Sequence, residues 1–154
     1  FSSIKENHND WDLVILGDGE ERESLEKLAK NLDVSDRVFF PGIVGNMAEW
    51  YERTDLFVLS SILEGFPNVL LEAMSYGVPS ISFDCDTGPR DIIHDGTNGI
   101  LVDPLEKESG LINALEELIT NEKLRQDISN SSIHLREKYS VSNTMNEWDR
   151  VLGL

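Results

Sequence analysis

Residues 60–79 read SSILEGFPNVLLEAMSYGVP, and this stretch decides the fold that the sequence predicts. It follows the apolar run 56–59, which is typical of a short buried strand, and it continues into a helical pattern over 68–76. Pro67 marks the expected start of that helix, because proline is favoured in the first turn, where its missing N–H costs nothing. A strand, a glycine-containing loop and a helix in this order are typical of a parallel α/β sheet.

The same succession recurs on both sides of this stretch. Short apolar runs, largely without alternation, are typical of strands buried on both faces, and they span residues 11–16, 38–40, 56–59, 80–83 and 99–102. Helical patterns are expected over residues 20–31, 47–53, 68–76 and 90–94. We therefore predict a Rossmann-like α/β fold, with a parallel sheet and helices on both of its faces.

The two ends of the chain differ from this pattern. From residue 107 onward the pattern is helical throughout, with an apolar stripe typical of packing and a last helix expected over 143–152. Residues 1–7 resemble the tail of a helix whose preceding strand is absent. We expect one domain over residues 1–154 that lacks its first strand, and the sequence leaves open whether a chain boundary or disorder in a longer protein explains this.

Charge and composition exclude several classes of function. The chain has 13 Lys and Arg against 29 Asp and Glu, a formal net charge of −16, which disfavours nucleic acid or an anionic membrane as a partner. No apolar run is long enough for a membrane span, and the N-terminus does not read as a secretory signal. The lone Cys85 fits a reducing cytoplasm. The three histidines lack metal-ligand spacing, so no metal site is expected.

The loop 17–19 is the first candidate for ligand binding, because ligands of parallel sheets bind at the carboxyl ends of the strands. Gly17 and Gly19 allow a tight turn and close approach of a ligand to the backbone. A dinucleotide fingerprint would need glycine at position 22, where the chain has Arg22, and this counts against a dehydrogenase. A simple strand-to-helix turn remains as good an interpretation of this loop.

The loop before Pro67 is the more informative candidate. The unpaired N–H groups and positive dipole end of the helix that follows would suit a diphosphate. Glu64 and Glu72 bracket the start of that helix, and carboxylates accept hydrogen bonds from hydroxyls of a sugar or a ribose. Two glutamates at this spacing also occur by chance in acidic proteins, and it is the glycine-proline helix entry between them that favours a site.

The stretch 64–79 resembles the E-x7-E signature, with its trailing E-A-M-x-x-G-x-P, of the retaining GT-B glycosyltransferases that use nucleotide-activated sugars. Further landmarks of that family are similar in order and type, and they cover residues 16–20, 38–44, 51–59 and 95–102. The resemblance spans about residues 1–120 and implies the C-terminal, donor-binding domain of a GT-B fold.

The resemblance also implies roles for individual residues. Glu64 would lie against the donor sugar, and Glu72 would hold the ribose hydroxyls. Glu64 is the one residue that we assign to catalysis, as a contact to the sugar and not as a nucleophile. The remaining donor-binding residues that we expect are Gly65, Phe66, Pro67, Asn68 and Val69 around the helix start, Ile43 beside the nucleobase, and Gly17 and Gly19. We expect no metal, because the helix end can stabilise the leaving diphosphate.

The loop 85–90 takes the place of a Gly-Gly loop of that family and resembles the T-G-P form of some capsule and lipopolysaccharide transferases. Arg90 is a candidate for touching the donor. A surface ion pair with Asp86 or Asp91 is the interpretation that we favour.

As a whole, the resemblance implies a glycosyltransferase of the hexosyltransferase type. It would use a nucleoside-diphosphate sugar, expected to be a UDP-sugar, with no cofactor, and a glycan or lipid-linked acceptor, in the synthesis of capsule, lipopolysaccharide or another surface polysaccharide. An N-terminal domain absent from this chain would supply the acceptor site and an Arg and Lys pair, so we expect the fragment alone to be inactive. The enzyme would be cytoplasmic, with any attachment to the inner face of the membrane made by the absent domain.

Two other readings of the sequence stay open. The chain could be a nucleotide-sugar-binding regulatory module that has lost the chemistry, although Glu64 and Glu72 are both present. It could also be another GT-B-like enzyme, such as a sugar-nucleotide epimerase, although that class would lack the E-A-M-x-x-G-x-P landmark. A phosphorylase would need a pyridoxal cofactor and a much longer chain.

Overall fold

A computed structural model describes residues 1–153 of the chain. It divides into two compact units, Phe1–Glu49 and Trp50–Leu154, with the short helix α2 (Met47–Tyr51) across the boundary. All strand pairs are parallel, as predicted, and they form one sheet in each unit. The single domain expected over residues 1–154 stays a prediction.

The first unit is a strand-helix-strand element. Strand β1 (Leu13–Leu16) pairs in parallel with β2 (Val38–Gly42), and α1 (Arg22–Asn31) connects them. The helix packs Ala29 against a small core that also contains Val34 and Val38. Arg22 of α1 forms an ion pair from its Nε to Glu26 Oε1 at 3.0 Å, one helical turn later, and its guanidinium also donates to Phe40 O of β2 at 2.6 Å.

The expectation that residues 1–7 form the tail of a helix is wrong. These residues form consecutive turns, in which the N–H groups of Ile4 and Lys5 both donate to Phe1 O at 3.0 Å. Ile4 is buried and the Phe1 ring packs beneath the guanidinium of Arg37, 5.5 Å from Cζ to the ring centroid. Ile4 and Phe1 therefore anchor these turns to the unit.

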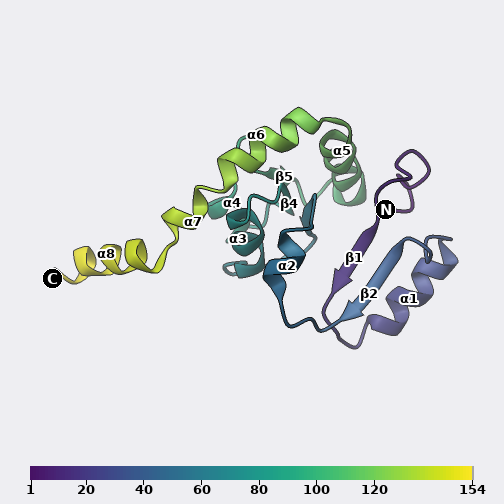
Figure 1. Cartoon of the computed structure of the whole chain (residues 1–154), viewed down its shortest axis with the longest axis horizontal. Helices are drawn as coiled ribbons and strands as arrows, with labels where there is room; N and C mark the ends of the chain where they lie inside the picture. Colours follow the sequence, from purple (N-terminus) through teal and green to yellow (C-terminus); the bar gives the residue numbers. More distant parts are fainter. Residues whose placement is uncertain (154) are drawn as a thin grey trace. The chain divides into compact units, whose positions relative to one another are not determined.

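The second unit has the three-stranded order β3-β4-β5, formed by β3 (Phe57–Leu59), β4 (Ser80–Phe83) and β5 (Ile100–Val102). The helices are α3 (Asn68–Ser75), α4 (Pro89–Ile92), α5 (Lys107–Thr120), α6 (Glu122–Ser132), α7 (Leu135–Lys138) and α8 (Val141–Leu152) (Figure 1). The central strand β4 is buried at all four positions, as expected for a strand covered on both faces, although Ser80 and Ser82 alternate with Ile81 and Phe83.

Alternate residues of the strands face two different apolar clusters. One face carries Ile81 and Phe83 and packs against α5 and α6 through Leu118 and Ile128. The other face carries Leu59 and packs against α3, α4 and α7; its buried members are Leu59, Leu70, Met74, Ile92, Ile93 and Leu135. Helices on both faces confirm the predicted α/β class.

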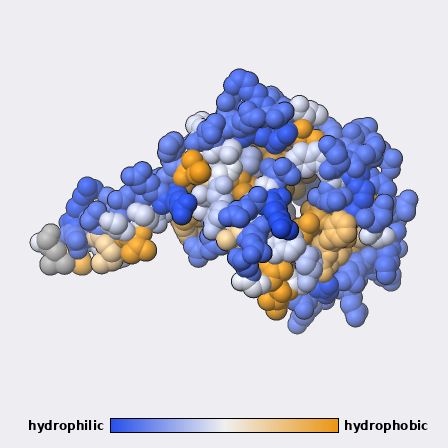
Figure 2. Space-filling model, in the orientation of Figure 1, coloured by the Kyte–Doolittle hydropathy of each residue, from blue (hydrophilic) through white to orange (hydrophobic). Residues whose placement is uncertain are grey.

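The C-terminal segment is helical throughout, as expected, and its last helix begins two residues earlier than expected. The hydroxyl of Ser140 accepts a hydrogen bond from Asn143 N at 3.2 Å and so caps α8 at its first turn. None of the residues of α8 is buried, and Val141, Met145 and Trp148 are exposed along it. Figure 2 shows the hydrophobic surface over this helix at the left of the view.

Among residues 1–153, no helix is both long and apolar enough to cross a membrane.

Candidate functional site

The site is built where β3 and β4 end, because parallel strands bring their carboxyl ends to one edge of the sheet. Residues 60–67 connect β3 to α3 and are called the β3–α3 loop. Residues 84–88 connect β4 to α4 and are called the β4–α4 loop. β3 and β4 are direct neighbours, so the two loops lie side by side.

Helix α3 begins at Asn68 with Pro67 as its N-cap, as the sequence predicts. No side chain caps this end, and its first turn has no acidic residue. The N–H groups of Leu70 and Leu71 both donate to Pro67 O, at 3.0 and 3.2 Å. In the part of the chain described, the N–H groups of Asn68 and Val69 have no acceptor, and both residues are exposed. This end of α3 therefore offers two free donors and the positive end of its dipole to an anion.

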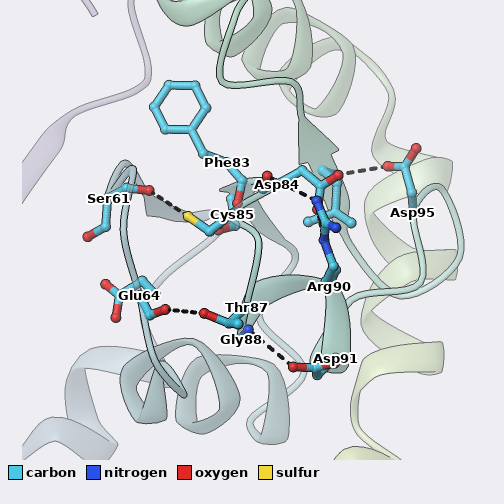
Figure 3. Close-up of polar contacts among 12 residues, drawn as sticks. Ser61, Glu64, Phe83, Asp84, Cys85, Thr87, Gly88, Arg90, Asp91 and Asp95 are labelled. Atoms are coloured by element: carbon cyan, nitrogen blue, oxygen red, sulfur yellow. Dashed lines mark hydrogen bonds and ion pairs between the residues drawn. The ribbon is translucent and has the colours of Figure 1, made fainter.

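Glu64 lies in the β3–α3 loop, half-buried, three residues before the N-cap of α3. Its main-chain oxygen accepts a hydrogen bond from the hydroxyl of Thr87 at 2.6 Å (Figure 3). Its carboxylate has no partner among the residues described and is free to accept from a ligand. Its charge also acts on the nearby Cys85 thiol, whose pKa is raised by burial first and by Glu64 second.

Glu72 lies on α3 and is held from the side by Tyr51 of α2. The phenol of Tyr51 donates to Glu72 Oε2 at 3.1 Å, and Tyr51 is 5% exposed. Burial, followed by the charge of Glu72, raises the pKa of Tyr51 to about 12, so the phenol stays protonated and acts as a donor. The bond orients the carboxylate and leaves its other oxygen for a second donor. Sequence reasoning did not find this pair.

The β4–α4 loop meets the β3–α3 loop at three points, and Figure 3 shows two of them, Cys85 with Ser61 and Thr87 with Glu64. Cys85 Sγ donates to Ser61 O at 3.2 Å, and Thr87 Oγ1 donates to Glu64 O. At Gly88, which has φ +91°, an added Cβ would lie 2.3 Å from Gly65 O. Only glycine fits this position, because both the backbone conformation and the space exclude a side chain.

Arg90 forms the surface ion pair that we favoured, but its partner was predicted wrongly. The guanidinium Nε lies 2.9 Å from Asp84 Oδ1, and this bond raises the pKa of Arg90. Asp91 is engaged elsewhere, because its carboxylate accepts from the N–H of Gly88 at 3.1 Å and closes the first turn of α4. The prediction considered Asp86 and Asp91 and did not include Asp84, which lies six residues before Arg90.

Beside these loops, an open hollow of about 680 Å³ lies at the ends of β4 and β5. Its lining is acidic and apolar, and consists of Ile62, Asp84, Cys85, Asp86, Arg90, Asp95, Leu101, Asp103, Pro104 and Leu105. Two of its carboxylates bond main-chain amides, Asp95 to Leu101 and Asp103 to Leu105, both at 2.8 Å. No group of three or more His, Cys, Asp or Glu in residues 1–153 is arranged to hold a metal ion.

The remaining candidate residues belong to the first unit. Gly17 has φ +108° and its N–H donates to Gly42 O at 2.9 Å, directly after β1. Neither Gly17 nor Gly19 has a neighbour that an added Cβ would meet within 4 Å, and Ile43 is 84% exposed after β2. Both loops are open at the carboxyl ends of their strands. The donor-binding role of Gly17, Gly19 and Ile43 stays a prediction.

Comparison with known proteins identifies the family of this chain. The family model described as "Glycosyl transferases group 1" matches residues 1–134. The amylovoran biosynthesis glycosyltransferase AmsD of Erwinia amylovora is 37% identical over 146 residues, which cover 93% of this chain and 40% of that protein. The chain spans about two fifths of the length of the curated relatives that it matches, 42%, 43% and 40% of the first three.

Solved structures agree with the predicted fold. The C-terminal domain of the glycosyl transferase group 1 family protein LpcC from Francisella tularensis matches with a TM-score of 0.81 and 28% identity, over 91% of this chain and 75% of that one. The pneumococcal O-GlcNAc transferase GtfA, in complex with UDP and GlcNAc, has the same fold, with a TM-score of 0.86 and 21% identity over 99% of this chain and 31% of that one. The predicted Rossmann-like fold of a GT-B C-terminal half is confirmed.

Proposed function

The chain belongs to the glycosyl transferases group 1 family, and we propose that it is the donor-binding part of a retaining glycosyltransferase. The donor is a nucleoside-diphosphate sugar, a UDP-sugar, and a hexosyl group moves to a glycan or lipid-linked acceptor. The acceptor is held by an N-terminal domain of the same protein. AmsD, named for amylovoran biosynthesis, supports a role in the synthesis of a surface polysaccharide.

The uncapped start of α3 is the observation that carries this proposal. The free N–H groups of Asn68 and Val69 point the same way as the helix dipole, and together they favour a diphosphate at this end. The chain has a formal net charge of −16, so an anion must be attracted by local geometry and not by the overall field. During transfer the diphosphate leaves with increased negative charge, which these donors stabilise without the need for reorganisation.

The two glutamates bind the ribose and the transferred sugar of the donor. Glu72, oriented by Tyr51, accepts from the ribose diol with its free oxygen. Glu64 accepts from a hydroxyl of the transferred sugar with a carboxylate that has no partner in the described part of the protein. The complex of GtfA with UDP and GlcNAc supports a donor of this class. We assign no general base, because the proposed acceptor site belongs to the N-terminal domain.

A panel of UDP-sugars tests the proposal on the full-length protein. Binding of at least one of them in calorimetry is expected, followed by transfer with the anomeric configuration kept, as read by NMR of the product. Binding without any turnover would instead support a regulatory module. Conversion of the donor to its epimer would support a sugar-nucleotide epimerase.

A further inference from the structure

Glu64 depends on one hydrogen bond for its position. Residues 62–66 belong to no helix or strand, and in the part of the chain described the only hydrogen bond that reaches Glu64 comes from Thr87. The distance from Thr87 Oγ1 to Glu64 O is 2.6 Å, and Thr87 is itself exposed. The residue that is proposed to hold the donor sugar is therefore fixed through its main chain by a side chain 23 residues later.

The loop that carries Thr87 is firmly held. Asp91 accepts from the N–H of Gly88 at 3.1 Å, and the main-chain oxygen of Asp91 accepts from the phenol of Tyr139 at 3.3 Å. The ring of Tyr139 also lies 5.8 Å from the ring of Phe66, two residues after Glu64. Gly88 leaves no room between the two loops, as the 2.3 Å approach to Gly65 O shows. Thr87 thus belongs to a well-anchored loop and donates to residues 62–66, which make few contacts of their own.

We propose that Thr87 is a positioning residue for glycosyl transfer, whose hydroxyl fixes the main chain of Glu64 and so places the Glu64 carboxylate against the donor sugar. This rests on the function proposed above. A displacement of about 1 Å in a reacting group can cost roughly 100-fold in rate. The nucleotide, in contrast, is held by α3 and Glu72, which Thr87 does not contact. Loss of the hydroxyl therefore lowers turnover and leaves nucleotide affinity nearly unchanged.

Three variants of the full-length protein test this. Thr87→Val removes the hydroxyl and puts a methyl in its place, which needs roughly 3.3 Å or more to a carbonyl oxygen and so displaces the Glu64 peptide. Thr87→Ser keeps the hydroxyl. Thr120→Val is the matched control, because Thr120 Oγ1 also donates to a main-chain oxygen, Glu116 O, at 2.6 Å, on the exposed end of α5. The probes are the release of UDP from the UDP-sugar that the wild type cleaves fastest, and calorimetry with UDP alone.

We expect kcat of Thr87→Val to fall about 10- to 100-fold, with UDP affinity within about threefold of the wild type. Thr87→Ser and Thr120→Val are expected to resemble the wild type in both measurements. The proposal is overturned if Thr87→Val keeps full turnover, if Thr87→Ser is equally impaired, or if turnover and UDP affinity fall by the same factor. Failure of the proposed function gives a different result, since the wild type itself would then release no UDP from any UDP-sugar, whether or not it binds UDP.

Discussion

Replacing Gly88 with alanine tests the close approach of the two loops. An added Cβ would lie 2.3 Å from Gly65 O and 2.7 Å from Pro67 Cδ, so the β3–α3 loop must move by about an ångström. The backbone at φ +91°, ψ −79° adds a conformational cost of roughly 1–3 kcal/mol for a residue with a side chain. Forcing a methyl into closed space costs about 1–3 kcal/mol more.

The matched control is Gly96→Ala. Gly96 also has a positive φ, +68°, but nothing lies within 4 Å of an added Cβ. This variant carries only the backbone cost, which is roughly 1–2 kcal/mol. The difference between the two variants therefore combines the contact between the loops with the less favourable backbone angles of Gly88, and we expect it to be at least about 1–3 kcal/mol in favour of Gly96→Ala.

Urea unfolding followed by far-UV circular dichroism measures both variants against the wild type. With m-values unchanged, the shift in midpoint reports the loss of stability directly. Hydrogen exchange of residues 61–67 provides a local reading, and we expect faster exchange there in Gly88→Ala alone. Equal losses of stability in the two variants would refute the reasoning, because they would show that Gly88 does not meet the β3–α3 loop.

Three further predictions concern the two glutamates and their surroundings. In the full-length protein, Glu72→Ala should weaken UDP binding by about 1–3 kcal/mol in calorimetry, because a diol loses its acceptor; unchanged affinity would contradict the assignment. Glu64→Gln should lower turnover by more than it lowers UDP affinity, and equal losses would show that Glu64 does not act on the sugar. The pKa of Tyr51 is raised from 10.0 to about 12, so the unfolded chain loses this proton before the folded one as the pH rises. The free energy of unfolding should then fall by about 1.4 kcal/mol per pH unit between pH 10 and 12 through this group, and Tyr51→Phe should remove that part of the slope in urea titrations.

Local patterns in the sequence were enough to predict the main elements. The start of α3 was predicted near Pro67 from the helical pattern over 68–76, and Pro67 lies at the N-cap and not in the first turn, where its missing N–H also costs no helical hydrogen bond. Strand β4 was found as a short run, but its burial on both faces did not follow from an apolar pattern, because Ser80 and Ser82 alternate with Ile81 and Phe83. Their hydroxyls donate to main-chain oxygens of Val78 and Phe83, which allows both serines to be buried.

Contacts between distant residues were not predictable in the same way. Tyr51 meets Glu72 across 21 residues and Thr87 meets Glu64 across 23, and both pairs depend on how the elements pack and on no periodic pattern. The partner of Arg90 was missed for a related reason. Asp84 reaches it because the chain reverses through Gly88, whose positive φ was not read from the sequence.

For residues 1–7, in contrast, the sequence predicted a helical element that the structure does not have. The segment resembled the tail of a helix, but its conformation is set by anchoring contacts, in which Arg37 donates to Lys5 O and His8 O at 3.1 and 2.7 Å. Tertiary contacts of this kind override weak local preference in a short segment.

The central claim is that a diphosphate binds at the amino end of α3. A crystal structure of the full-length protein with UDP tests it most directly. We expect phosphate oxygens within about 2.7–3.2 Å of the main-chain nitrogens of Asn68 and Val69, with the ribose hydroxyls at Glu72. UDP bound away from α3, or that helix end covered by another part of the protein, would contradict the account.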